Sequence, residues 1–300
     1  MIDNKINNMS KRKARYYIGL ILKKFLPSVI KKQFIYSRLS FTKVVSTDID
    51  GKKLFFQCHA EEVSNTIFYT GVFGDYEGQS LKIWHDLIVK LNIKTIMDVG
   101  AYSGIYSITA ACANEDAEIH SYEPNPYAFN LLKQNCNLNN MAIINCHDYA
   151  VAERTGELEF YNFGDTYSTG MTSVNHRYVE KNISISSFKA KGIFEIRKEI
   201  NKKIELIKLD IERAELPLLT HAKKLLQEDR PIILCEVLDE TDYVDYQGLL
   251  ESLNYGYIQI NDDDHTHTEC ESMLDHGDQS VGRNWIFYPK EIKAKILSVL

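Results

Sequence analysis

Short runs of apolar, β-branched residues alternate along the chain with longer segments that carry apolar residues at helical spacing. The apolar runs predict buried strands at residues 94–100, 117–126, 141–152, 204–211 and 231–238. The helical spacing predicts helices at residues 79–93, 105–115, 127–140, 214–229 and 243–256. Gly256 is the expected stop of the last of these helices. This alternation is typical of an α/β fold in which helices cover a mostly parallel sheet.

The last part of the chain departs from this alternation. Residues 257–260 and 284–289 predict two strands with no helix between them, so these strands must pair antiparallel. Residues 156–163 predict an additional strand of a hairpin, whereas residues 164–203 are polar and irregular and predict no element. A nicotinamide dehydrogenase would normally continue with another crossover unit. The antiparallel ending therefore disfavours a Rossmann-type oxidoreductase.

Charge divides the 300-residue chain into two unequal parts. Residues 1–40 hold ten Lys or Arg and one acid and carry +9, whereas the whole chain carries −6. No apolar run is long enough for a membrane-spanning helix, and Lys23 and Lys24 interrupt the one that resembles a signal peptide. Two interpretations stay open: a basic amphipathic helix at an anionic membrane surface, or a solvated helix packed on the domain. We expect a basic N-terminal extension at 1–69 and one domain at 70–300.

Cysteine usage and net charge limit the compartment and the partners. The six cysteines include no C-x-x-C pair and no zinc spacing, which is typical of reduced thiols in a cytosolic protein. The negative net charge gives no reason to expect a nucleic-acid partner. We therefore expect a cytoplasmic protein, with peripheral contact at the inner face of the membrane through residues 1–40 as the alternative. The oligomeric state is not predicted.

The segment DVGAYSG (98–104) is a candidate ligand-binding turn between a predicted strand and a helix. Gly100 permits the sharp turn, and Gly104 allows a ligand close to the backbone at the helix N-terminus. A dinucleotide motif needs a glycine where this chain has Tyr102, so a diphosphate would meet a side chain there. A nucleoside with a smaller polar tail, such as S-adenosylmethionine, fits better. Glu123, at the end of the next strand, is placed to accept hydrogen bonds from ribose hydroxyls.

Acidic residues follow the predicted strand at 204–211. Asp210 lies at the carboxyl edge of the sheet, where ligands bind in open α/β folds, and it is a candidate base or orienter for an acceptor hydroxyl. Glu212 is a second candidate, and only one of the two need reach the acceptor. Alternatively, these acids cap the next helix or pair with Lys208 and Arg213.

A second acidic segment, at 262–276, lies between the last two predicted strands and emerges at the same sheet edge. His265 or His267 is a candidate general base. Mixed His and carboxylate side chains could also hold a metal, but the spacing matches no strong metal signature, and we predict none. A solvated acidic loop is the alternative that these residues favour.

These segments together carry a family resemblance. DVGAYSGIYS, YEPNP, AVAERTGELEFY, IKLDIERAELPLL and PIILCEV occur in the order seen in the FkbM-type family of S-adenosylmethionine-dependent methyltransferases, which the chain resembles over roughly residues 70–290. The resemblance implies a Rossmann-like methyltransferase fold with a mostly parallel seven-stranded sheet and an antiparallel last strand, to which a helical N-terminal extension is added. It also implies O-methylation, often of sugar or natural-product hydroxyls.

The resemblance assigns further residues to the cofactor. The methionine part of S-adenosylmethionine is assigned to Asp98, Gly100, Ala101, Tyr102, Gly104 and Ile105. The ribose is assigned to Glu123, and the adenine is expected between Asp148, Tyr149 and Ala150. Tyr102 stands where the family often has Asn, and Arg213 stands where it usually has Gly. These departures put the substrate class in doubt more than the cofactor.

The sequence therefore predicts an S-adenosylmethionine-dependent O-methyltransferase that acts on a glycan or another polyhydroxyl small molecule. Asp210, Glu212, His265 and His267 are the catalytic candidates. The alternative from another class is a non-catalytic module that binds a nucleoside cofactor and is tethered to a membrane assembly by residues 1–40.

Overall fold

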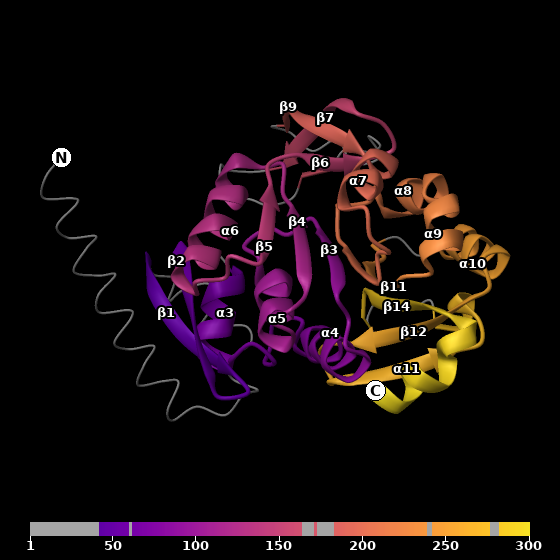
Figure 1. Cartoon of the computed structure of the whole chain (residues 1–300), viewed down its shortest axis with the longest axis horizontal. Coiled ribbons are helices and arrows are strands. Elements are labelled where there is room, and N and C mark those ends of the chain that lie inside the picture. The colour runs from indigo at the N-terminus through magenta and orange to yellow at the C-terminus, as the bar shows by residue number, and fades with distance from the viewer. Residues whose placement is uncertain (1–41, 60–61, 164–170, 173–182, 239–241, 277–281) are drawn as a thin grey trace, which may run out of the picture.

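A single central sheet organises the molecule (Figure 1). The computed structural model describes residues 42–59, 62–163, 171–172, 183–238, 242–276 and 282–300. The eight strands of this sheet lie in the order β13-β12-β14-β11-β10-β3-β4-β5. Their bounds are β3 (Thr95–Val99), β4 (Glu118–Tyr122), β5 (Ile144–His147), β10 (Leu206–Leu209), β11 (Ile232–Glu236), β12 (Tyr255–Asn261), β13 (Thr266–Cys270) and β14 (Asn284–Pro289).

The strand directions confirm the predicted sheet. β5, β4, β3, β10 and β11 pair parallel, and β14 lies antiparallel between β11 and β12. The expected count of seven strands is exceeded by one, because β13 forms an antiparallel hairpin with β12 at the edge of the sheet. The segment expected as an acidic loop at 262–276 thus contains a strand and a short 3-10 helix, η2 (Met273–His276).

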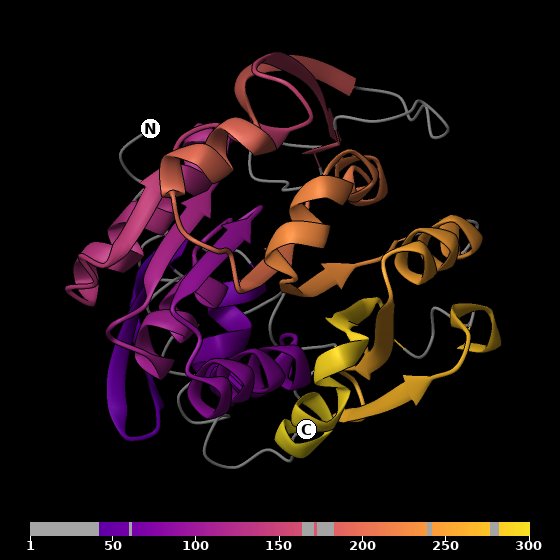
Figure 2. The same cartoon turned by 45° about the vertical axis from the view of Figure 1, so that its right-hand side comes forward.

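Helices cover both faces of the sheet, as Figures 1 and 2 show. Their bounds are α4 (Gly78–Leu91), α5 (Ile105–Ala113), α6 (Pro126–Leu138), α7 (Ile193–Ile200), α8 (Glu215–His221), α9 (Lys223–Asp229), α10 (Tyr243–Ser252) and α11 (Lys293–Val299). Alternate strand residues enter two separate cores: Ile96 and Leu206 pack with α4, α5, α6 and α11, whereas Met97 and Ile207 pack with α7 to α10. Burial on both faces explains why these strands read as continuous apolar runs.

Several predicted boundaries need correction. The helix expected at 214–229 is divided into α8 and α9 at Ala222. Gly256 does not end α10 but lies inside β12, where the ring of Tyr288 on the paired strand leaves no room for a Cβ. The strand expected at 141–152 is two strands that belong to different sheets, β5 and β6 (Ala150–Ala152).

A second sheet of four strands, in the order β6-β9-β7-β8, extends the carboxyl edge of the central sheet (Figure 1). β7 (Gly156–Phe163) is the hairpin strand that the sequence predicted. Its partners β8 (Met171–Thr172) and β9 (Ile183–Gly192), together with α7, lie in the range for which the sequence predicted no element.

The described part of the expected N-terminal extension is a hairpin followed by a helix, not a helix alone. β1 (Thr42–Ile49) pairs with β2 (Lys52–His59), and α3 (Glu62–Thr70) follows. Two amides of β2, those of Phe55 and Gln57, donate to the side chains of Asn139 and Asn135 at 2.8 Å each. Phe56 joins the core beneath α4 to α6. The membrane contact expected of residues 1–40 concerns residues outside the described ranges and stays a prediction.

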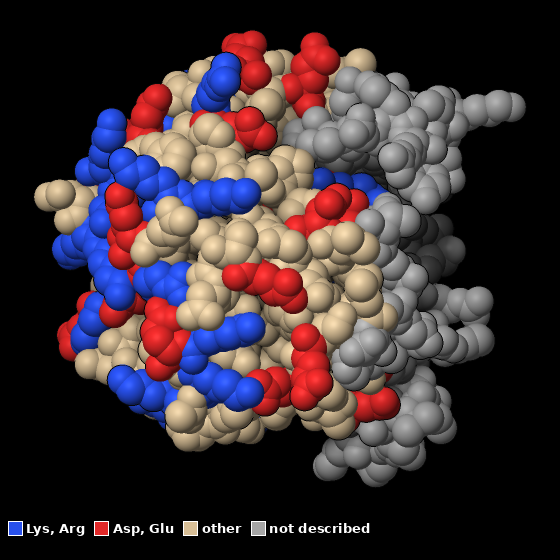
Figure 3. Space-filling view, turned by 90° about the vertical axis from the view of Figure 1, so that its right-hand side faces the viewer, with Lys and Arg blue, Asp and Glu red and all other residues tan. Residues whose placement is uncertain are grey.

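Surface charge is mixed on the face formed by the C-terminal half of the sheet. Lys and Arg side chains are interspersed with Asp and Glu side chains there (Figure 3). Within the described ranges, no helix is long and apolar enough to cross a membrane.

Candidate active site

The turn from β3 to α5 is held against the end of β10. Gly100 has φ +83°, and a Cβ placed there would lie 1.8 Å from the carbonyl oxygen of Asp210. A side chain at this position would collide with the backbone at the end of β10, so Gly100 is needed for the fold itself. A Cβ at Gly104 would likewise lie 2.4 Å from Leu132 Cδ1, so that glycine allows α5 and α6 to approach.

A cavity of about 700 Å³ opens at the carboxyl ends of β3, β4 and β10, next to the small sheet. The predicted site residues that line it are Gly100, Tyr102, Glu123, Ala150, Asp210 and Glu212. The predicted site residues that do not line it are Asp98, Ala101, Gly104, Ile105, Asp148, Tyr149, His265 and His267. The structure thus brings the ribose candidate and the leading catalytic candidate into one cavity.

Glu123 is fixed by backbone donors at the end of β4. Its Oε2 accepts from the amide of Tyr102 at 2.9 Å, and its Oε1 accepts from the amide of Asn125 at 2.8 Å. Burial raises the pKa of Glu123 to about 7, although these two amides oppose the shift. A carboxylate offers about four acceptor sites. The two that remain suit vicinal ribose hydroxyls, so this residue fits a nucleoside cofactor.

Asp98 is buried beneath the turn and does not face the cavity. Its Oδ2 accepts from the hydroxyl of Ser107 on α5 at 2.5 Å, and this hydroxyl lies 2.5 Å from that of Ser121 on β4. Burial raises the pKa of Asp98 to about 6. Its Oδ1 has no hydrogen-bond partner among the described residues. The assignment of Asp98 to the methionine part of the cofactor stays a prediction.

The residues expected around the adenine are arranged in two ways. Ala150 lines the cavity, whereas Asp148 is exposed. The ring of Tyr149 packs against those of Tyr122 and His147, and the ammonium of Lys191 lies 5.5 Å from its centroid. Tyr149 therefore does not line the cavity itself but packs against Tyr122, which does.

Lys208 organises the acids at the end of β10. Its side chain is only 1% exposed, and its Nζ donates to Asp210 Oδ2 at 3.0 Å. The ammonium also lies 4.9 Å from the ring centroid of Tyr106, whose hydroxyl donates to Glu77 Oε2 at 2.6 Å. Burial opposes the charge, but the carboxylates of Asp210, Glu77 and Glu236 outweigh it and raise the pKa of Lys208. The pairing with Lys208, the alternative to catalysis, therefore exists and holds Asp210 in place.

The carboxylate of Asp210 affects other acids nearby. Burial is the main cause, and the negative charge of Asp210 the second, of a rise in the pKa of Glu236, at the end of β11, to about 10 and in that of Glu212 to about 7. Glu212 and Arg213 have φ +56° and +82°, a region that L-residues rarely adopt. This geometry explains why glycine suits the position of Arg213. No described side chain caps the start of α8; instead Glu215, in its first turn, accepts at Oε1 from the amide of Ile211 in the preceding loop at 2.7 Å.

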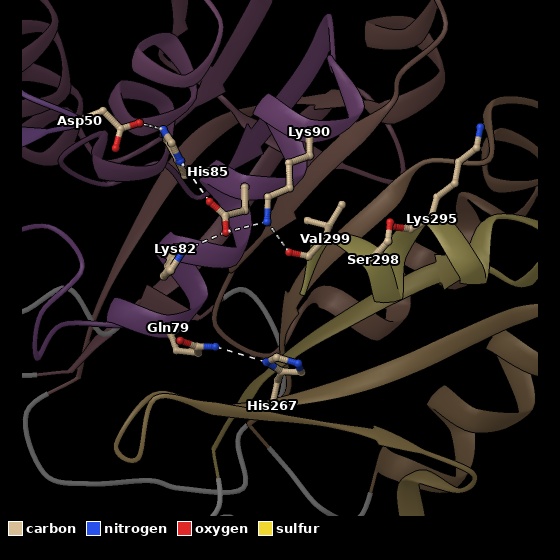
Figure 4. Close-up of polar contacts among 10 residues, drawn as sticks. Asp50, Gln79, Lys82, His85, Lys90, His267, Lys295, Ser298 and Val299 are labelled. Carbon is tan, nitrogen blue, oxygen red and sulfur yellow. Dashed lines mark hydrogen bonds and ion pairs between the residues drawn. The ribbon is translucent and has the colours of Figure 1, made fainter.

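The histidine candidates lie on the β12–β13 hairpin, beside the start of α4. His267 Nδ1 is 3.3 Å from Gln79 Nε2 (Figure 4). Asp262 accepts from the amide and the hydroxyl of Ser80 at 2.8 and 2.7 Å, which docks the hairpin on α4. His265 follows in the turn with φ +53°. Among the described residues, no group of His, Cys, Asp and Glu has the arrangement of a metal site.

Two residues of this site, unlike Lys208, were missed in the sequence. Lys208 had a signal, because a lysine in the middle of an otherwise apolar strand is either snorkelling or paired, and it was expected as an ion-pair partner of the acids. Glu77 and Tyr106 had none, because their contact joins two helix starts that are far apart in the chain.

Removal of the Glu123 carboxylate tests the ribose assignment. We expect Glu123→Ala to weaken binding of S-adenosylhomocysteine by about 1–3 kcal/mol, or about 5–150-fold, because ribose hydroxyls lose their acceptors. Wild-type affinity should rise as pH increases through about 7, because a carboxyl of that pKa loses its proton there and accepts at every site.

Calorimetric titrations at several pH values measure both effects. Glu153→Ala is the matched control, since Glu153 lines the same cavity but is exposed. Glu212 titrates in the same pH range, so the informative quantity is the difference between wild type and Glu123→Ala. If wild type and Glu123→Ala bind S-adenosylhomocysteine with equal affinity and the same pH profile, Glu123 does not bind the ribose.

Comparison with known proteins finds a matching family model and several similar solved structures. Residues 98–259 match the model of the methyltransferase FkbM domain. A methyltransferase FkbM from Methylobacillus flagellatus KT is 17% identical, with a TM-score of 0.44, and covers 66% of this chain. The match spans 44% of that protein, less than half of its length.

Two further solved structures are similar. A SAM-dependent methyltransferase from Agrobacterium tumefaciens is 11% identical over 84% of this chain and 71% of that one, with a TM-score of 0.46. An O-methyltransferase from Bacillus cereus in complex with SAH is 12% identical over 69% of this chain and 79% of that one, with a TM-score of 0.39. A search of curated proteins found no match.

Proposed function

The chain belongs to the FkbM family of methyltransferases, which use S-adenosylmethionine, and from this premise we propose that it methylates a hydroxyl of a glycan or another polyhydroxyl acceptor. The observation that supports the proposal most is the position of Asp210. It lines the cavity that also holds Gly100 and Glu123, and Lys208 fixes its carboxylate at 3.0 Å.

Methylation of a hydroxyl requires a residue that orients the hydroxyl and accepts its proton, and the Asp210 carboxylate can do both. S-adenosylmethionine supplies a methyl group activated by a sulfonium. Asp210 orients the acceptor hydroxyl by accepting its hydrogen bond and takes up the proton as the oxygen becomes an ether. Lys208 donates to one carboxylate oxygen of Asp210, and Glu236 also hydrogen-bonds to this carboxylate. A carboxylate offers about four acceptor sites, so about two remain for the acceptor hydroxyl. Positioning of this kind contributes up to about 7–11 kcal/mol when reactants are well oriented.

The other catalytic candidates, Glu212, His265 and His267, are less well placed than Asp210 to accept the proton. Glu212 lines the cavity, but it lies in the loop after β10 with its backbone at φ +56°, whereas Asp210 directly follows the strand. His265 and His267 lie on the hairpin beside α4 and do not line the cavity. We therefore assign the proton to Asp210 and no step of the reaction to the two histidines.

The chemistry of the product tests O-methylation directly. Incubation with methyl-labelled S-adenosylmethionine and a panel of glycans and polyols should yield label that resists alkali, because an alkyl ether has no acyl or phosphoryl centre to hydrolyse. Label that alkali releases as methanol would indicate a carboxyl ester, and label on an amine would indicate N-methylation; either result contradicts the proposal. Binding of S-adenosylhomocysteine with no transfer to any acceptor of the panel would favour the non-catalytic module.

A further inference from the structure

Two cysteines on neighbouring elements lie in contact at the far side of β5 from the active site. Cys136 on α6 and Cys146 on β5 have their Sγ atoms 3.9 Å apart. α6 and β5 lie side by side in Figures 1 and 2. The mechanism proposed above uses neither thiol.

Both cysteines line an open groove. The groove has a volume of about 600 Å³, and Lys133 and Met141 also line it. Cys136 is nearly buried at 6% exposure, whereas Cys146 is partly exposed. A small oxidant therefore reaches Cys146 first, with the second thiol directly behind it.

The two thiols differ in character. The hydrogen bond between the two thiols, with a further contribution from the charge of Lys133, lowers the pKa of Cys146. The same hydrogen bond raises the pKa of Cys136. Cys112 is also partly exposed, but burial raises the pKa of its thiol to about 11. Thiolate character and exposure determine which thiols are oxidised, so Cys146 is favoured over Cys112.

We propose that Cys136 and Cys146 are an oxidisable pair that forms a reversible disulfide in response to a hydroperoxide. The Cys146 thiolate attacks a peroxide oxygen, so that an S–O bond forms, the O–O bond breaks, and the leaving oxygen takes a proton. Cys136 then attacks the sulfenic sulfur, the S–S bond forms, and water leaves with the Cys136 proton. Two electrons pass from the sulfurs to the peroxide, and a dithiol or glutathione returns them.

This pair is connected to the cofactor cavity through the backbone. The carbonyl of His147, next to Cys146, accepts from the amide of Glu123 at 3.0 Å. Asn125, the N-cap of α6, donates its amide to Glu123 Oε1 at 2.8 Å. A disulfide that draws α6 toward β5 moves both contacts of Glu123. We expect weaker cofactor binding in the oxidised protein, and this consequence rests on the ribose role proposed for Glu123.

Peptide mapping after treatment of the full chain with hydrogen peroxide tests the pair. We expect a mass loss of two hydrogens and one disulfide-linked peptide that joins Cys136 to Cys146, both reversed by dithiothreitol. Cys112→Ser, the matched control, should still form this disulfide, whereas Cys146→Ser should not. Linkage to another cysteine, or over-oxidation of Cys146 with no disulfide, would overturn the proposal.

The effect on binding is measured separately. Titration with S-adenosylhomocysteine should give an affinity about 5-fold or more lower for the oxidised than for the reduced wild type, and no difference for Cys136→Ser treated in the same way. A mapped disulfide with unchanged affinity would overturn the link to the cavity. Glu123→Ala, which contains the intact cysteine pair, distinguishes this failure from a failure of the ribose assignment. If reduced Glu123→Ala binds S-adenosylhomocysteine as tightly as reduced wild type, the ribose assignment is wrong. If it binds more weakly and the disulfide has no effect in wild type, only the link is wrong.

Discussion

Asp210→Asn should reduce turnover by a factor on the order of 10²–10⁴ while affinity for S-adenosylhomocysteine changes little. The substitution keeps the size of the side chain, and the amide oxygen still accepts from Lys208. It removes the negative charge and the capacity to take a proton at neutral pH. The loss should therefore appear in the rate of methyl transfer at saturating cofactor, measured with an acceptor identified from the labelling panel.

Neighbouring variants determine how this result is read. Glu212→Gln removes a carboxylate two residues away in the same cavity and should reduce turnover much less. His265→Ala and His267→Ala should leave proton transfer intact, because neither residue lines the cavity. Full turnover of Asp210→Asn would exclude Asp210 as the base and leave proton removal to water.

Gly100→Ala should lower the free energy of unfolding by about 3 kcal/mol or more. An L-residue at positive φ costs roughly 1–2 kcal/mol, and overpacking adds about 1–3 kcal/mol. Here the Cβ would lie 1.8 Å from the Asp210 carbonyl oxygen, so the end of β10 has to move. Urea denaturation measures the change in the free energy of unfolding, provided that its dependence on urea concentration has the same slope in both proteins.

Gly51 provides the matched control, because it has a similar φ of +79° but a Cβ added there would have nothing within 4 Å. Gly51→Ala should therefore show only the conformational part, about 1–2 kcal/mol. Equal losses in the two variants would show that the contact with β10 contributes nothing. The larger loss in Gly100→Ala would also mean that weaker cofactor binding by this variant reports a displaced Asp210 as much as a changed cofactor site.

The elements that the sequence predicted well are those buried on two sides. β10 and β11 are apolar over most of their length because both faces enter a core. β13, with the sequence THTEC, was missed because it is an edge strand that pairs only with β12. Four of its five residues are exposed or half-buried, so its sequence contains no apolar run. β9 was missed for a related reason, since its polar alternation ISISSFKAKG contains no apolar run.

Candidate site residues were predictable where a general rule of the fold places them. Glu123 and Asp210 follow parallel strands, whose carboxyl ends share one edge, and both line the cavity. The rule does not say which way a side chain turns after the strand ends. Asp98, Gly104 and Tyr149 lie in the expected segments, yet their side chains or backbone face the interior packing.

The place of β14 in the sheet has a consequence for how the chain folds. β14 follows β12 and β13 in sequence, yet it lies between β11 and β12 and is the strand that joins them. The β12–β13 hairpin can form early, because its contacts are local, but it has no place on the sheet until β14 has been synthesised. Until then β11 has an unpaired edge, which is a template for pairing with another chain. During synthesis, the interval between β11 and β14 is therefore when this protein depends most on protection from aggregation.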